Sequence, residues 1–189
     1  YVGLSTALAI KSAAPALAVL LVDLAPPVAE RHQADLRASA IALAAQKMLH
    51  SLGVWEKLAA HAQPINDMVI TDSKTGDAVR PVYLTFAGAL EEGQPFAHMI
   101  PNQIMVGALE EKARAAGVVI LSRDSVIDFE ERETGQMIWL RSGRLVVARL
   151  LVAADGAKSG LRAIAGIKTV HWDYGQSGIV TTVRHEKPH

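Results

Sequence analysis

The chain has 189 residues, half of them hydrophobic, and its 19 basic and 19 acidic side chains cancel at pH 7. This length suits one domain, or one domain and part of another, and the balanced charge argues against a nucleic-acid binder, which normally carries a basic face. With no cysteine, no metal-ligand spacing among the seven histidines and no apolar run of roughly 18 residues, the sequence predicts no disulfide, metal site or transmembrane helix.

The first elements in chain order predict half of a dinucleotide-binding unit. A helix is predicted over Gly3–Ala14 and a buried strand over Leu17–Asp23. Gly3 fits the last glycine of the dinucleotide-binding motif Gly-x-Gly-x-x-Gly. Asp23 lies 20 residues after Gly3, the spacing at which this motif has an acidic residue that binds a ribose hydroxyl. We expect the first strand and the first two glycines of this unit to precede Tyr1.

The middle of the chain alternates between helical and hairpin patterns. Apolar periodicity predicts helices over Ser39–Leu52 and Trp55–His61. Two apolar runs, Ile65–Thr71 and Val79–Phe86, flank a polar, glycine-containing turn and predict a hairpin. Pro101–Ala116 predicts a further helix that starts on proline.

The last third of the chain is rich in strand patterns. Three strands are predicted over Val126–Arg132, Gln136–Arg141 and Arg144–Ala154, with two more within Thr169–Glu186. A parallel-type start followed by an antiparallel meander predicts the α/β class, as a nucleotide-binding domain with a small inserted sheet.

Asp155-Gly156 ends the apolar run Leu150–Ala154 and is the most informative motif of the chain. A carboxylate at the carboxyl end of a buried strand lies where open α/β sheets bind ligands, and a glycine there allows close approach of a phosphate or ribose. The alternative interpretation is a common Asp-Gly turn after a strand.

Asp-Gly-Ala-x-Ser-x-x-Arg after such a strand resembles the Asp-Gly motif of flavin-dependent aromatic hydroxylases, the group that includes para-hydroxybenzoate hydroxylase. Within this group, the chain is most similar to hydroxylases of ubiquinone biosynthesis. The similarity runs along the whole chain, in the segments Tyr1–Ala9, Arg37–Ile41, Leu52–Glu56, Leu151–Arg162, Ala165–Ile167, Trp172–Gln176 and Glu186–His189.

The resemblance implies a Rossmann-like FAD-binding domain, truncated, with an inserted antiparallel β-sheet that is part of a substrate domain. The family is about twice as long, so the chain resembles an N-terminal half. The expected organisation is a FAD-binding domain over 1–62 and 100–168, an inserted substrate-domain portion over 63–99, and the start of a substrate-domain sheet over 169–189.

The resemblance also implies FAD as cofactor, NAD(P)H as reductant and seven cofactor-binding residues: Gly3, Asp23, Arg37, Asn102, Val126, Asp155 and Gly156. Gly3 would pack the pyrophosphate-binding helix, and Asp23 would bind the adenosine ribose where the family usually has glutamate. Val126 would border the adenine through its backbone. For Arg37 the alternative is a solvated loop cation, and for Asn102 a polar residue at a helix end.

The implied reaction is a monooxygenase hydroxylation of an aromatic ring, with molecular oxygen and a substrate that is a prenylated ubiquinone precursor. No residue is predicted as acid–base catalyst; His98, in an apolar stretch, is predicted to be a satisfied core or interface residue. The expected location is cytoplasmic, with peripheral association to the membrane or a ubiquinone complex. Two alternatives remain: another FAD- or NAD-linked oxidoreductase on the same fold, and an inert fragment that acts only as a binding module.

Overall fold

The computed structural model describes residues 1–31, 35–71, 74, 76–87, 95–179 and 183–186. The chain divides into two compact units, which are described separately: unit 1 is Tyr1–Ala34 with Leu109–Ile179, and unit 2 is Asp35–Ala108 with Val180–His189. The helix α4 (Asn102–Ala115) contains the boundary between them. The domains predicted from the sequence were defined by their expected functions and not by contacts, so that division stays a prediction.

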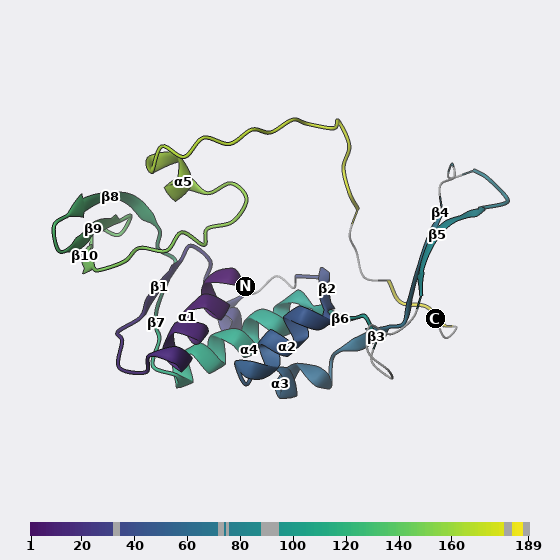
Figure 1. Ribbon diagram of the computed structural model, residues 1–189, viewed down its shortest axis with the longest axis horizontal. Helices are drawn as coiled ribbons and strands as arrows, with labels where there is room; N and C mark the ends of the chain where they lie inside the picture. The colour runs from purple at the N-terminus through teal and green to yellow at the C-terminus, as the bar shows by residue number, and fades with distance from the viewer. Residues whose placement is uncertain (32–34, 72–73, 75, 88–94, 180–182, 187–189) are drawn as a thin grey trace. The chain divides into compact units, whose positions relative to one another are not determined.

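Unit 1 is built on two parallel strands, β1 (Leu20–Asp23) and β7 (Val119–Ser122). In their register Leu20 lies opposite Val119, and Asp23 lies opposite Ser122. The helix α1 (Val2–Ala13) precedes β1, and this confirms the predicted helix–strand start (Figure 1). The strand begins later than predicted because Leu17 lies in a turn, in which its N–H donates to the carbonyl of Ala14 at 3.0 Å. The strand β7 was not predicted.

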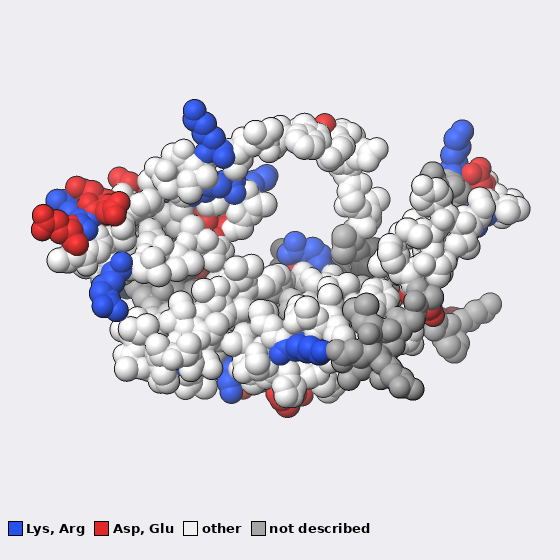
Figure 2. All heavy atoms as spheres, viewed as in Figure 1, with Lys and Arg blue, Asp and Glu red and all other residues white. Residues whose placement is uncertain are grey.

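A three-stranded antiparallel meander follows β7, with the strands β8 (Val126–Arg132), β9 (Gly135–Leu140) and β10 (Leu145–Ala148) in the order β10-β9-β8. These strands confirm the predicted meander. At Gly135 a Cβ would lie 2.4 Å from the carbonyl oxygen of Ala148, so only glycine fits this close approach. Charged side chains gather at the hairpin between β8 and β9 (Figure 2), where the run Glu130–Glu133 lies.

The prediction of a buried strand up to Ala154 was wrong. β10 ends at Ala148, and Leu150 and Val152 are 73% and 49% exposed. Within the described residues no strand pairs with Leu150–Ala154, so its backbone groups lack the ladder that makes a strand. The short helix α5 (Gly160–Ile164) follows the Asp-Gly turn.

The two strands predicted within Thr169–Glu186 were also wrong for the residues that the structure describes there, 169–179 and 183–186. Val170 and Ile179 are 91% and 92% exposed, so nothing packs on their apolar side chains to favour a sheet. Residues 180–182 and 187–189 lie outside the described residues.

Unit 2 holds an antiparallel sheet in the order β2-β6-β3, formed by β2 (Ala38–Ala42), β6 (Ala97–Pro101) and β3 (Gln63–Ile65). The helices α2 (Leu43–Ser51) and α3 (Trp55–Ala59) follow β2. The predicted helix over Ser39–Leu52 is therefore wrong in its first part. Residues Ser39–Ala42 belong to β2 and pair with β6, a strand that was not predicted. The helix begins at Leu43, whose N–H donates to the carbonyl of Phe96 at 3.2 Å.

The hairpin predicted after α3 is confirmed as β4 (Asp67–Thr71) and β5 (Val82–Ala87), which pair with each other in a two-stranded sheet. Large apolar side chains on it are exposed, among them Tyr83 at 76% and Phe86 at 50%. In unit 2 the core lies instead under β6 and the helices, where Ile100 and Leu58 are fully buried. None of the helices in the described ranges is both long and apolar enough to cross a membrane.

Candidate functional site

The carboxyl end of β1 in unit 1 carries Asp23, as the sequence predicts, and its side chain is half-buried. Its Oδ1 accepts the N–H of Ala25 at 2.9 Å, which closes a tight turn after the strand. Its backbone carbonyl accepts the N–H of Asp124 at 3.2 Å, two residues before Val126 begins β8. Asp23 and Val126 are thus brought to the same strand end, the edge at which open parallel sheets bind ligands.

Gly3 lies in the first turn of α1, between β1 and the segment that leads to Asp155. A Cβ added to Gly3 would be 3.5 Å from Ala154 Cβ and 3.7 Å from Leu21 Cδ1. Both are ordinary van der Waals contacts, so the helix packs closely at this point without requiring glycine for space. Gly3 and the Asp-Gly motif therefore lie near each other in unit 1.

Asp155 binds its own turn. Its Oδ1 accepts the hydroxyl of Ser159 at 2.5 Å, and its Oδ2 accepts the N–H of Leu161 at 3.2 Å. Ser159 is the N-cap of α5 and accepts the N–H of Arg162 at 3.0 Å. The carboxylate therefore helps to satisfy the free N–H groups of a helix start, which is the role of capping side chains.

The pKa of Asp155 reflects these hydrogen bonds. Desolvation is the largest single influence and raises the pKa, but the bonds from Ser159, from the N–H of Leu161 and from further backbone groups together outweigh it, so the pKa is lowered. The carboxylate is thus held in its charged form. Gly156 follows in the left-handed region, at φ +86°, which favours glycine.

A cavity of about 460 Å³ opens beside this turn within unit 1. Its lining is largely apolar, with Phe129 of β8 and Leu161 of α5 among its walls, and it also includes Asp155 and Gly156. Gln136 of β9 lines it too, and the buried Oε1 of this side chain has no hydrogen-bond partner among the described residues.

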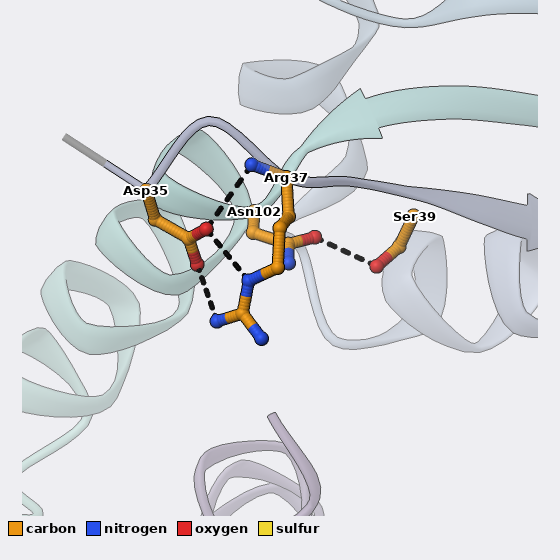
Figure 3. Close-up of polar contacts among 4 residues, drawn as sticks. All are labelled: Asp35, Arg37, Ser39 and Asn102. Carbon is orange, nitrogen blue, oxygen red and sulfur yellow. Dashed lines mark hydrogen bonds and ion pairs between the residues drawn. The ribbon is translucent and has the colours of Figure 1, made fainter. Parts of the chain in front are cut away.

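Arg37 and Asn102 come together in unit 2, where Asn102 N–H donates to the carbonyl of Arg37 at 3.0 Å. Asn102 begins α4, is 6% exposed, and accepts the hydroxyl of Ser39 on its Oδ1 at 2.7 Å (Figure 3). Arg37 makes a two-pronged ion pair with Asp35, from Nε to Oδ1 and from Nη2 to Oδ2, each at 2.8 Å. The two predicted residues thus form one polar cluster with Asp35 and Ser39.

The charges of this cluster are fixed by Arg37. Its hydrogen bonds, from side chain and backbone, lower the pKa of Asp35 to about 2, and Asn102 adds to the effect. The side chain of Arg37 is nevertheless 67% exposed. Sequence reasoning overlooked Asp35 and Ser39, although the Asp-x-Arg spacing is a signal for a pair that meets across a turn.

His98 of β6 packs against Trp55 of α3, with the ring centroids 5.1 Å apart in an edge-to-face arrangement. The side chain is half-buried, and the prediction of a satisfied histidine was wrong. The buried Nδ1 has no hydrogen-bond partner among the described residues. Desolvation lowers the pKa of His98, so the imidazole is held neutral.

Comparison with known proteins gives the following matches. A family profile described as "FAD binding domain" matches residues 17–187. Ubiquinone hydroxylase UbiL of Rhodospirillum rubrum is 36% identical over 156 residues, which cover 82% of this chain and 35% of that protein. The 3-demethoxyubiquinol 3-hydroxylase of Escherichia coli is 31% identical over 185 residues, 95% of this chain and 46% of that protein. The chain thus spans less than half the length of these relatives.

Solved structures share the fold. A structure of the Diels-Alderase PyrE3 matches with a TM-score of 0.69 at 19% identity, covering 88% of this chain and 33% of that one. The flavin-dependent monooxygenase PieE, crystallised with FAD and substrate, matches with a TM-score of 0.66 at 21% identity, covering 88% and 30%. These likenesses and the profile match confirm the fold class predicted from the sequence.

Proposed function

Because the chain belongs to the FAD-binding-domain family, we propose that it is the part of a flavin-dependent monooxygenase that binds FAD. The observation that carries this proposal is the match to two named ubiquinone-pathway hydroxylases at 36% and 31% identity across most of the chain. The full-length protein would use NAD(P)H and molecular oxygen to hydroxylate an aromatic ring of a ubiquinone precursor. When bound, FAD supplies the oxygen-activating chemistry of such a reaction.

In unit 1 we propose that Gly3, Asp23, Val126, Asp155 and Gly156 contact FAD. Two observations fit this group. The buried Oε1 of Gln136 lacks a partner beside the Asp-Gly turn, and no atom lies within 4 Å of a Cβ built on Gly156, so the backbone there is open to a ligand. Asp23 would accept a ribose hydroxyl on the oxygen that does not bind Ala25.

In unit 2 we propose that Arg37 and Asn102 contact FAD. Arg37 would supply positive charge to a phosphate or to the ribityl chain, and its pairing with Asp35 would hold the guanidinium in one orientation. Asn102 would keep its amide fixed through its bond to Ser39. The described residues offer no candidate for an acid–base catalyst, so the proposed work of this chain is to bind, orient and exclude water.

The test is to purify the full-length protein, record its flavin absorbance and measure NAD(P)H-dependent oxygen uptake with soluble analogues of ubiquinone precursors. We expect bound FAD and a product with one added ring hydroxyl. Bound FAD with hydrogen peroxide but no hydroxylated product would overturn the monooxygenase proposal in favour of another oxidoreductase on this fold. A colourless protein would overturn the flavin proposal and leave a binding module.

A genetic test addresses the substrate. Deletion of the gene should lower ubiquinone and accumulate a prenylated intermediate that lacks one ring hydroxyl. Such a substrate is almost insoluble in water, so the proposal includes peripheral association of the protein with a membrane or with a ubiquinone-pathway complex. Normal ubiquinone in the deletion strain would assign the protein to a different aromatic substrate.

A further inference from the structure

The segment from Arg123 to Ser125 crosses the carboxyl end of the β1–β7 pair in unit 1 and carries a strained residue. Arg123 is at φ +59°, and it is the one residue other than glycine with positive φ in the part of the chain that the structure describes. A side chain in this region costs free energy, so the surrounding structure must hold it there. The contacts of this turn with its neighbours hold Arg123 in this conformation.

The backbone of this turn is bonded to the turn that follows β1. Arg123 N–H donates to Ala25 O and Asp124 N–H donates to Asp23 O, both at 3.2 Å. The guanidinium of Arg123 also pairs with Glu30, from Nη2 to Oε2 at 2.7 Å. The ends of β1 and β7 are therefore joined directly at the edge where parallel sheets bind ligands.

The side chain of Asp124 joins a third segment to this edge. Asp124 is 4% exposed, and its Oδ1 accepts the N–H groups of Ser125 at 2.9 Å and Ser142 at 3.1 Å. Its Oδ2 accepts the hydroxyl of Ser142 at 2.5 Å. Ser142 belongs to the turn between β9 and β10, so one buried carboxylate connects the meander to the strand ends.

The charge of Asp124 is maintained in this position. The hydroxyl of Ser142, together with the two backbone N–H groups and the nearby positive charge of Arg144, lowers its pKa although desolvation opposes this. A buried carboxylate with three hydrogen bonds favours one arrangement of its partners, because moving Ser142 away would remove the hydrogen bond to Oδ2 and one of the two to Oδ1. Ser125, the residue before Val126, is one of these partners, and the backbone N–H of Asp124 binds the carbonyl of Asp23.

We propose that Asp124 is a positioning residue for the adenosine half of the bound dinucleotide, because it sets the backbone of Asp23 and of Val126 at one ligand-binding edge. The proposal rests on the proposed FAD-binding function of the chain. Asp124 itself uses both oxygens on the protein, so it acts through these neighbours and not by contact with the ligand.

The experiment measures dissociation constants of FAD and FMN for the full-length apoprotein, by titration of flavin fluorescence. FMN has the flavin ring and one phosphate but lacks the adenosine half. We expect Asp124→Ala to weaken FAD binding at least tenfold and to change FMN binding less than twofold. Asp124→Asn keeps an acceptor for both N–H groups and a donor for Ser142 Oγ, so its dissociation constant for FAD should stay within about threefold of the wild-type value.

The matched control is Ile138→Ala, which removes a buried side chain of the same meander, 4% exposed, that lies opposite Phe129 of β8. It should lower the melting temperature as a structural defect does and leave the ratio of FAD to FMN affinity unchanged. Ser142→Ala removes one hydrogen bond of Asp124 and keeps the proposal falsifiable if Asp124→Ala does not fold. It should shift the ratio in the same direction as Asp124→Ala, by a smaller factor.

The proposal is overturned if Asp124→Ala or Ser142→Ala folds and keeps the wild-type ratio of affinities, or if Ile138→Ala changes the ratio equally. These outcomes leave the proposed function intact, because the wild type would still bind FAD. A wild-type protein that binds no FAD overturns the proposed function and this inference with it.

Discussion

Several aspartates of this chain bind the turns in which they lie. Asp23 accepts from Ala25, Asp35 pairs with Arg37, and Asp155 accepts from Ser159 and from the N–H of Leu161. A sequence motif identifies the residue type and its place relative to a strand, and both were predicted correctly for Asp23, whereas no strand ends at Asp155. It does not show how many of the oxygens the protein itself uses, because this depends on the turn geometry.

The N-cap of α5 gives a direct test of this local role. Ser159→Ala removes the acceptor for Arg162 N–H and the donor to Asp155, so we expect a loss of about 0.5–2 kcal/mol in the free energy of unfolding. Urea unfolding of the 189-residue chain measures it. Lys158→Ala, at the exposed preceding residue, is the control; equal midpoints for the two variants would show that the cap contributes nothing.

The bond between Ser39 and Asn102 can be isolated by a double-mutant cycle. Because Asn102 is 6% exposed, Asn102→Ala leaves buried partners unpaired and should cost about 1–3 kcal/mol. With Ser39→Ala and the double variant, the coupling free energy from chemical unfolding should be about 0.5–1.5 kcal/mol. Additive effects would mean that the two side chains do not stabilise each other in solution.

Elements with local signals were predicted well, and elements that depend on distant partners were not. The helices α1, α3 and α4 and the hairpin β4–β5 follow from periodicity, proline and turn residues nearby in the sequence. β2 was taken for helix because its alanines suit either state, and pairing with β6, far along the chain, decides for strand. Leu150–Ala154 shows the reverse case, in which an apolar run has no pairing strand among the described residues.

His98 makes the stability of unit 2 depend on pH. Its pKa in the folded chain lies below the ordinary value of 6.5, so the unfolded state takes up its proton first as the pH falls. The contribution of the neutral imidazole is present above about pH 6.5 and is lost as the pH falls toward the folded pKa.

Chemical unfolding at pH 8 and pH 5 tests this. His98→Phe should keep the contact with Trp55, remove the unpartnered Nδ1 and weaken the loss of stability between the two pH values. His61→Phe, at an exposed position, is the control. If both variants follow the wild-type pH dependence, the buried state of His98 has no part in it.

The hairpin β4–β5 should be the least stable sheet of the chain. It has two strands and exposed side chains, whereas β9 pairs on both edges within the meander, and an isolated two-stranded hairpin is marginal in water. In hydrogen exchange of the 189-residue chain, its amides should exchange faster than those of β9, by roughly tenfold or more. Equal protection would indicate that another part of the chain covers the hairpin in solution.

For the whole molecule, the order and spacing of motifs predicted more than any single element did. Segments from Tyr1–Ala9 to Glu186–His189 led to the FAD-binding class, and the profile match over residues 17–187 confirms it. The arrangement inside the candidate site was less accessible. Asp124 was overlooked because its importance depends on β7 and on the distant turn at Ser142, and neither partner is marked in the neighbouring sequence.

The parallel pairing of β1 with β7 also sets an order of events during translation. Leu20 pairs with Val119, 99 positions later, and at about 5–20 residues per second a ribosome needs roughly 5–20 s to extend the chain from one strand to the other. β2, β3 and β6 all emerge within this interval and can pair before β7 exists. β1 must therefore wait for this partner strand on the nascent chain, and chaperones that bind unpaired strands would act in this interval.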